Sequence, residues 1–231
     1  MILPTQRNRK CIFIMNNPAS IQPTHTPAPR GRPADPRKDA QIIMAADKLF
    51  MQHGVAGTTM EHIARDADVS KLTLYRRYPD KNTLFTAVIS ERCRRYMPDS
   101  LFETSPDTDP HAVLVRIGCA LIALITSESS VNLNRIITTE SAHNPQLTAQ
   151  FYAEGPQRIR NLTLDLMKTF NTEGHVAIDD PAEAAEMFSA LIVGCEYCKR
   201  CNMNMCPTPT HQQIEAYVKK AASFFLRAYT K

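Results

Sequence analysis

The chain has 231 residues, 43% of them hydrophobic and 22% charged, which is enough to fold around one or two hydrophobic cores. Its 7 glycines are too few for a glycine-rich phosphate-binding fold or for an all-β chain with many tight turns, and no apolar run reaches the roughly 18 residues of a membrane span. Of the 27 Lys and Arg residues, 16 lie among the first 100 positions, against 9 of the 23 Asp and Glu, so the net charge of +4 hides a basic N-terminal part. This asymmetry fits a polyanionic partner for that part, and it fits a chance distribution of surface charge equally well.

Residues 1–36 hold 7 of the 16 prolines. They bury too little apolar surface to offset the entropy of ordering, so we expect a disordered, Pro-rich basic tail. The apolar run at residues 11–15 is shorter than the roughly 7–15 residues of a secretory signal core, so no secretory leader is expected. Met15 is an alternative start residue.

From Asp39 onward apolar residues recur at helical spacing, and the first stripe ends before Gly54. Thr58 and Glu61 have the spacing of a capping box, which predicts the start of a second, short helix. Ser70 and Asp80 are expected to cap a third helix over residues 71–78 and a fourth over 81–97. The pattern predicts longer helices over residues 111–126, 131–141, 145–170, 181–202 and 209–229, with a kink or break at Gly155-Pro156.

The predicted fold class is therefore all-α. We expect a three-helix helix-turn-helix DNA-binding domain over residues 37–86 and a helical ligand-binding and dimerisation domain over 87–231. No stretch shows the alternation of a β-strand.

Two short helices joined by a tight turn occupy residues 58–78, and the second is basic and aromatic on its outer face, as in a helix-turn-helix. Its N-terminal end carries Lys71, which can donate to guanine, and Leu72 and Thr73, which can contact a thymine methyl. The expected phosphate contacts are Tyr75, Arg76, Tyr78 and Lys81, and the helix starts Thr58, Thr59 and Ser70 complete the predicted DNA-binding set. A helix-turn-helix used only for packing is the alternative, which the basic outer face disfavours.

The residues around this unit resemble the tetracycline-repressor (TetR) family of bacterial transcription regulators over roughly residues 38–86. The resemblance is carried by Ala45-Ala46-Asp47-Lys48-Leu49-Phe50, Gly57-Thr58-Thr59-Met60, Ala67-Asp68-Val69-Ser70-Lys71, Thr73-Leu74-Tyr75-Arg76 and Tyr78-Pro79-Asp80-Lys81. It implies a DNA-binding regulator in the bacterial cytoplasm, associated with the nucleoid, that is not an enzyme and is by default a repressor. It also implies phosphate contacts from Tyr75, Tyr78 and Lys81. Leu72 departs from the small residue that is common there, so the operator sequence does not follow from the resemblance.

Arg30 and Arg32 precede the first predicted helix in an Arg-Gly-Arg-Pro arm. Such an arm can lie in a narrow A·T minor groove, where the negative potential attracts guanidinium groups. The alternative is a solvated linker end.

Residues 135–159 look like one subgroup of this family, the regulators of efflux and stress genes. The resemblance implies a homodimer through the helices predicted at 181–202 and 209–229, a palindromic operator, and an unknown small-molecule effector in a cavity among the middle helices. The expected cavity residues are Ile117, Leu121, Leu124, Ile125, Phe151, Tyr152, Leu166 and Phe188. Plain core packing is the alternative for each of them.

The cysteines are 7 in number, so they cannot all pair within one chain, and four of them form the run Cys195, Cys198, Cys201 and Cys206. The run has one residue more than a ferredoxin cluster motif, and it falls on a predicted helix, where residues three apart turn away from a common point. The interpretations we keep are reduced buried thiols, a redox sensor, and a metal sensor in which a cysteine pair is completed by Cys206, His211 or a second subunit. Disulfides between subunits are also possible if this helix forms the dimer interface. A metal or iron–sulfur protein of another class remains a further alternative. No catalytic triad, phosphate loop or metal-binding His spacing occurs, so we expect neither an enzyme nor a resident cofactor.

Overall fold

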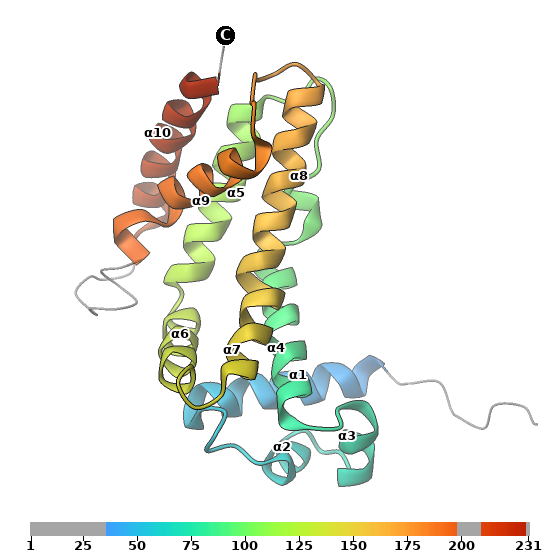
Figure 1. Cartoon of the computed structure of the whole chain (residues 1–231). Coiled ribbons are helices and arrows are strands. Elements are labelled where there is room, and N and C mark those ends of the chain that lie inside the picture. The colour runs from blue at the N-terminus through green and yellow to red at the C-terminus, as the bar shows by residue number, and fades with distance from the viewer. Residues whose placement is uncertain (1–35, 198–208, 230–231) are drawn as a thin grey trace, which may run out of the picture. The chain divides into compact units, whose positions relative to one another are not determined.

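The computed structural model describes residues 36–197 and 209–229, without the side chains of 195–197 (Figure 1). Within these ranges all regular structure is helical, which confirms the all-α prediction. The helices are α1 (Pro36–His53), α2 (Met60–Asp66), α3 (Lys71–Arg77), α4 (Lys81–Tyr96), α5 (Pro110–Thr126), α6 (Glu128–Glu140), α7 (Pro145–Tyr152), α8 (Arg158–Thr172), α9 (Pro181–Tyr197) and α10 (His211–Tyr229). A 3₁₀ turn, η1 (Asp99–Leu101), follows α4, and a π-helical turn, η2 (Ala153–Gln157), joins α7 to α8 at the expected kink.

Side chains at two of the predicted caps determine where α3 and α4 begin. The Ser70 hydroxyl accepts from the backbone N–H of Thr73 at 3.1 Å and begins α3, and Asp80 accepts from the N–H of Thr83 at 2.7 Å and begins α4. The predicted capping box at Thr58 is wrong by one residue, because the cap of α2 is Thr59.

Thr58 has a different role from the predicted cap. It is buried, and its hydroxyl donates to the backbone carbonyls of Gly54 at 2.8 Å and Leu49 at 3.2 Å. These bonds link Thr58 to the last turn of α1 and to the residue that follows the helix. Thr58 therefore closes the turn after α1, and its hydroxyl is not available to DNA.

Two hydrophobic clusters hold the described helices together. The first cluster contains residues of helices α1, α2, α3 and α4, together with Leu133 and Ile137 of α6 and Leu147 of α7. The second is built from α5, α8, α9 and α10. The boundary expected between residues 86 and 87 falls inside α4, so one continuous helix leads from the end of α3 into the part of the chain that follows residue 86. Figure 1 shows α4 rising from the end of α3, and this helix packs against α7 and η2.

Close backbone packing brings α5 against α9 and α10. A Cβ atom placed on Gly118 of α5 would lie 2.6 Å from Val218 Cγ1 on α10 and 3.0 Å from Ile192 Cδ1 on α9. The backbone of α9 leaves helical geometry at Gly194, whose φ of +33° is in the region that favours glycine. The hydroxyl of Tyr217 donates to the carbonyl of Leu191 just before this point.

No single helix of the described ranges has both the length and the hydrophobicity of a membrane span. The pair α5 and α6 meets the criterion only when taken together, and the two helices are bent by 63°.

Candidate DNA-binding surface and ligand cavity

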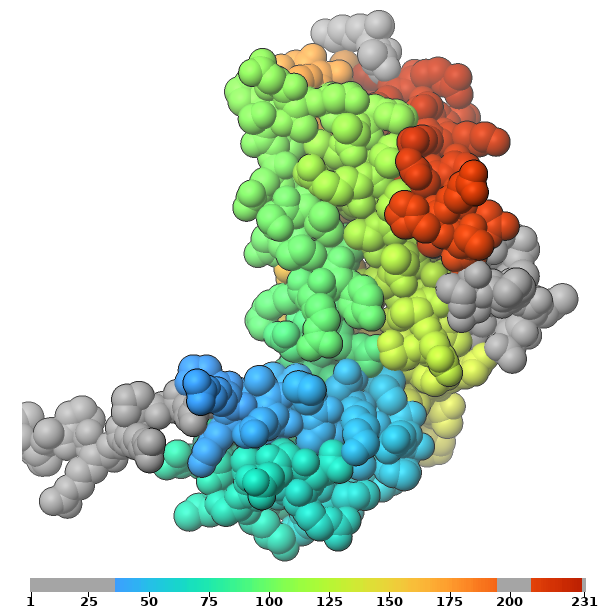
Figure 2. Space-filling view, turned by 180° about the vertical axis from the view of Figure 1, so that it is seen from behind, coloured from blue at the N-terminus to red at the C-terminus, as the bar shows by residue number. Residues whose placement is uncertain are grey.

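Helix α3 is held by one buried residue and presents most of its other side chains to solvent. Leu74 is fully buried, whereas Lys71, Leu72, Tyr75 and Arg76 are exposed. Leu72 is 80% exposed, although burial of a leucine side chain would stabilise the folded protein. These exposed residues form the outer face of the helix-turn-helix, and Figure 2 shows this part of the chain forming one end of the molecule in the view from behind.

Three of the predicted DNA-binding residues make contacts with other parts of the protein. Lys71 lies 3.4 Å from the carboxylate of Glu61 on α2, and the backbone together with Lys71 lowers the pKa of that carboxyl group. Tyr78 is half-buried, and burial together with the nearby Asp39 raises the pKa of its hydroxyl. The ammonium of Lys81 donates to the carbonyl of Thr58 at 2.9 Å and to that of Ala56 at 3.4 Å. These side chains fix the positions of the short helices in the free protein.

The remaining predicted DNA-binding residues divide into two groups. Thr59 and Ser70 are exposed caps, and the hydroxyl of Thr73 lies 2.8 Å from that of Ser70. Arg30 and Arg32 lie outside the described residues.

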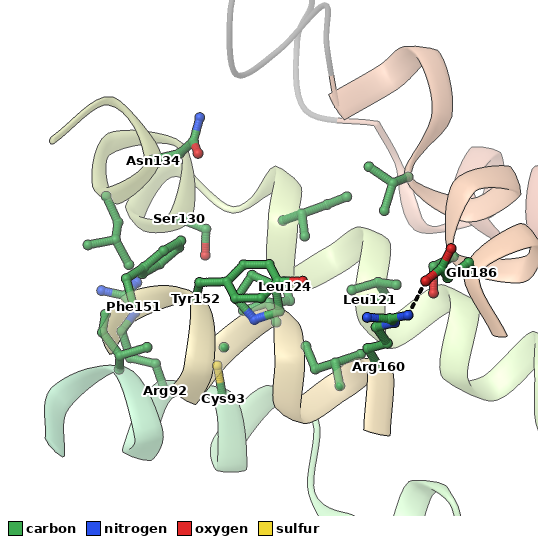
Figure 3. A pocket seen from close by; sticks show the side chains of 18 residues that line it. Arg92, Cys93, Leu121, Leu124, Ser130, Asn134, Phe151, Tyr152, Arg160 and Glu186 are labelled. Carbon is green, nitrogen blue, oxygen red and sulfur yellow. Dashed lines mark hydrogen bonds and ion pairs between the residues drawn. The ribbon is translucent and has the colours of Figure 1, made fainter. Parts of the chain in front are cut away.

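A cavity of about 450 Å³ opens among the helices that follow the helix-turn-helix (Figure 3). The described part of its wall comes from α4, α5, α6, α7, η2, α8 and α9. The lining residues are Ile89, Arg92, Cys93, Leu121, Leu124, Ile125, Ser130, Leu133, Asn134, Phe151, Tyr152, Gly155, Pro156, Ile159, Arg160, Glu186, Ser189 and Val193. The volume lies within the range of small-molecule sites, and most of the lining is apolar.

Five of the eight residues expected around a cavity line this one. They are Leu121, Leu124, Ile125, Phe151 and Tyr152. The other three, Ile117, Leu166 and Phe188, belong to the hydrophobic core and do not line it. Phe188 instead packs edge-on against Phe225 of α10 with ring centroids 5.3 Å apart.

The polar lining residues were not predicted, and Arg92 is the most informative of them. Its side chain is 8% exposed, and its guanidinium donates to the carboxylate of Asp47 on α1 at 2.6 Å. Arg92 follows Val88 and Ile89 at helical spacing, so it occupies a position on the apolar face of α4. That position is the sequence signal that could have identified it.

Further side-chain contacts join α4 to the rest of the cavity wall. The hydroxyl of Ser90 donates to Glu154 of η2, and the sulfur of Cys93 lies 3.6 Å from the position of a Cβ on Gly155. At the other end of the cavity Arg160 and Glu186 form an ion pair (Figure 3). The wall facing α4 is therefore tied to it by polar contacts and close packing.

The described cysteines are not activated thiols. Burial raises the pKa of Cys93 and of Cys119 above the ordinary value of 9.0. Cys198, Cys201, Cys206 and the side chain of Cys195 lie outside the described residues, so the alternatives built on them are not tested. Among the described residues no group of His, Cys, Asp and Glu side chains has the arrangement of a metal site.

Two family models match the chain. The model described as bacterial regulatory proteins of the tetR family matches residues 42–88, and the model described as the C-terminal domain of AefR-like transcriptional repressors matches residues 112–231.

Relatives and solved structures agree with these matches. The uncharacterized HTH-type transcriptional regulator YvkB of Bacillus subtilis is 29% identical over 154 residues, which are 67% of this chain and 78% of the relative. The regulator Rv2250c of Mycobacterium tuberculosis is 33% identical over 106 residues, 43% of this chain and 54% of that one.

Two solved structures superimpose on most of the chain. A TetR-family regulator from Mesorhizobium loti has a TM-score of 0.74 and 26% identity, and the flavonoid-responsive regulator FrrA has a TM-score of 0.69 and 29% identity. Each comparison covers 85% of this chain and 98% of the other. The chain therefore belongs to the TetR family of transcriptional regulators, and it is a DNA-binding protein rather than an enzyme.

Proposed function

We propose that this protein is a ligand-gated repressor, which binds a palindromic operator as a homodimer and releases it when a small aromatic effector enters the cavity. As a regulator of bacterial genes it would act in the cytoplasm, where the chromosome lies. The observation that carries the proposal is the position of α4. This helix follows α3 after a connection of three residues, packs in the core of the helix-turn-helix, and supplies Ile89, Arg92 and Cys93 to the cavity wall.

The exposed face of α3 supports a role in reading DNA. Lys71 and Leu72 stand in its first turn, where a recognition helix contacts base edges in the major groove. Tyr75 and Arg76 lie one turn further on and are exposed, as phosphate contacts must be. Thr58 is left out of this proposal because its hydroxyl is used inside the protein.

Exposed apolar side chains on the last two helices support a homodimer. Met187 on α9 is 52% exposed, and Tyr217 and Phe224 on α10 are 41% and 59% exposed. Large apolar groups in water mark association surfaces when they occur together on neighbouring elements. A twofold dimer would place two copies of α3 about 34–36 Å apart, one turn of DNA, which requires a palindromic operator.

The lining of the cavity favours an effector with an aromatic ring. Phe151 and Tyr152 stand beside aliphatic side chains of α5, and aromatic rings stack best on other flat rings. FrrA, 29% identical to this chain, is named a flavonoid-responsive regulator, and this likeness supports a flat aromatic effector here. Such a ligand would release DNA if it favoured a state in which the two recognition helices no longer match the operator.

The test is selection of binding sites from random DNA with the full chain, followed by binding measurements with and without aromatic compounds. We expect the selected sites to be palindromic and one or more aromatic compounds to weaken binding. Selected sites without twofold symmetry would contradict the dimeric complex. Binding that no compound in an aromatic panel changes would contradict gating through the cavity.

A further inference from the structure

We propose that the effector carries a single carboxylate, and that this carboxylate binds Arg92 in competition with Asp47. The inference rests on the proposed function in one respect, because it takes the cavity as the effector site. It adds the chemical class of the ligand and the residue that recognises its charged group.

Arg92 can be reached from two sides. One nitrogen of its guanidinium donates to Asp47 on α1, while the side chain also forms part of the cavity wall with Ile89 and Cys93 (Figure 3). A guanidinium group has five N–H donors in a planar fork, and a carboxylate fits two of them at once. A ligand carboxylate in the cavity is therefore within reach of a donor that is matched to its shape.

The burial of the two partners differs, and this difference favours an exchange of partners. The side chain of Arg92 is 8% exposed, so leaving its charge without a partner is strongly unfavourable. The side chain of Asp47 is 28% exposed and can be hydrated when it loses Arg92. A carboxylate that replaces Asp47 leaves no unpaired charge in the interior, whereas an apolar ligand without an acceptor cannot replace it.

The other charged groups around this wall already have partners. Arg160 is paired with Glu186, Arg158 donates to Asp99, and Glu154 accepts from the hydroxyl of Ser90. Among the described lining residues, Arg160 and Glu186 neutralise each other, so Arg92 is the charged side chain whose partner, Asp47, is not part of the lining. A ligand carboxylate can replace Asp47 as the counter-charge of Arg92, whereas a cationic ligand would be repelled by this guanidinium.

The exchange would also transmit the signal. Asp47 lies on α1 and Arg92 on α4, so their ion pair joins the first helix of the DNA-binding half to a wall of the cavity. Removing Arg92 from Asp47 loosens this junction. Because coupling between two sites is reciprocal, a protein without the Asp47 carboxylate should bind an acidic ligand more tightly.

The experiment compares two probes of the same shape on the full chain, 2-naphthoate and 2-naphthamide, by titration calorimetry. We expect the carboxylate to bind about tenfold more tightly than the amide, because a hydrogen bond to a charged group is worth more than a neutral one. Arg92→Gln should abolish this preference. Arg95→Gln is the matched control, since Arg95 lies on the same helix, is 58% exposed and pairs with Glu91, so the preference should remain.

Asp47→Asn tests the exchange separately and keeps Arg92 in place. It should tighten 2-naphthoate binding severalfold and leave 2-naphthamide binding unchanged; unchanged or weaker naphthoate binding would overturn the exchange. If Arg92→Gln does not fold, this variant alone decides.

Equal affinity for both probes, or a preference that survives Arg92→Gln, would overturn the role of Arg92 and leave the cavity as the effector site. Failure of both probes to bind would overturn the inference as well. Operator selection, measured without any probe, reports separately on the proposed DNA-binding function.

Discussion

The ammonium of Lys81 at the start of α4 donates to the backbone carbonyl of Thr58 at 2.9 Å, and Thr58 in turn closes the turn after α1. The first residue of α4 is thereby fixed to the segment that precedes α2. Family resemblance assigns Lys81 a phosphate contact, whereas in the free protein its charge stabilises the helix-turn-helix from within. The two roles have different experimental consequences.

We predict that Lys81→Met lowers the free energy of unfolding by about 1–2 kcal/mol, because it removes a charged donor from partly buried carbonyls. Urea unfolding measures this change. Lys38→Met is the control, since Lys38 is exposed on α1. If Lys81→Met leaves stability unchanged and only reduces the salt dependence of operator binding by about one ion, Lys81 is a phosphate ligand without a structural role.

Leu72 should act as a reader of thymine. Its side chain is 80% exposed in the first turn of α3, where an apolar group can contact only what the helix meets in the groove. We predict that Leu72→Ala leaves stability unchanged within about 0.5 kcal/mol and weakens binding to the selected operator by roughly threefold to tenfold.

Replacing single thymines of the operator by uracil isolates the methyl contact, because uracil lacks only that methyl group. At one position the uracil substitution should weaken operator binding by the unmodified protein. The same substitution should not further weaken operator binding by the Leu72→Ala variant. Equal losses for both proteins at every position would show that Leu72 contacts no thymine methyl.

The close approach of α5 to α10 predicts a steric effect at Gly118. An alanine Cβ there would lie 2.6 Å from Val218 Cγ1, so Gly118→Ala should lower stability by roughly 1–3 kcal/mol. The added Val218→Ala change removes the clashing methyl groups, and the double variant should regain part of the loss. Thermal unfolding of the single and double variants measures both effects. Additive losses in the double variant would contradict the clash.

The starts of α3 and α4 could be predicted from the sequence because local hydrogen bonds determine them. Ser70 and Asp80 cap as predicted, since the capping hydrogen bond spans only three residues. The start of α2 was misplaced because two adjacent threonines can both cap, and only the buried position of Thr58 distinguishes them. Local pattern could not decide between neighbours that differ in tertiary contacts.

The cavity depends on tertiary packing and was only partly predictable. Leu121, Leu124 and Ile125 line it from the last two turns of α5, whereas Ile117 lies one turn earlier on a similar face and packs in the core. The packing of the other helices decides which part of a helix face lies in the core and which part lines a cavity. Arg92 was not predicted, although its spacing from Val88 and Ile89 places it on the apolar face of α4.

Cys93 predicts a pH dependence that originates in the cavity wall. Burial raises the pKa of its thiol above 9.0 in the folded protein, so the unfolded chain loses this proton first as the pH rises. The contribution of the thiol to stability is therefore complete below about pH 9 and decreases above it. Unfolding measured from pH 7 to 10 should show a steeper loss for the unmodified protein than for Cys93→Ala, and parallel curves would contradict the assignment.

Met187 and Phe224 should control the oligomeric state. They are 52% and 59% exposed on α9 and α10, and a carboxylate at either position would become desolvated if these helices pair with a second copy. We predict that Met187→Glu combined with Phe224→Glu shifts the protein to a monomer in analytical ultracentrifugation at about 10 µM and weakens operator binding by at least 100-fold, because each half-site must then bind independently. Met44→Glu, at a residue that is 67% exposed on α1, is the control for added charge and should leave the sedimentation coefficient unchanged. A double variant that remains dimeric would place the dimer interface elsewhere on the molecule.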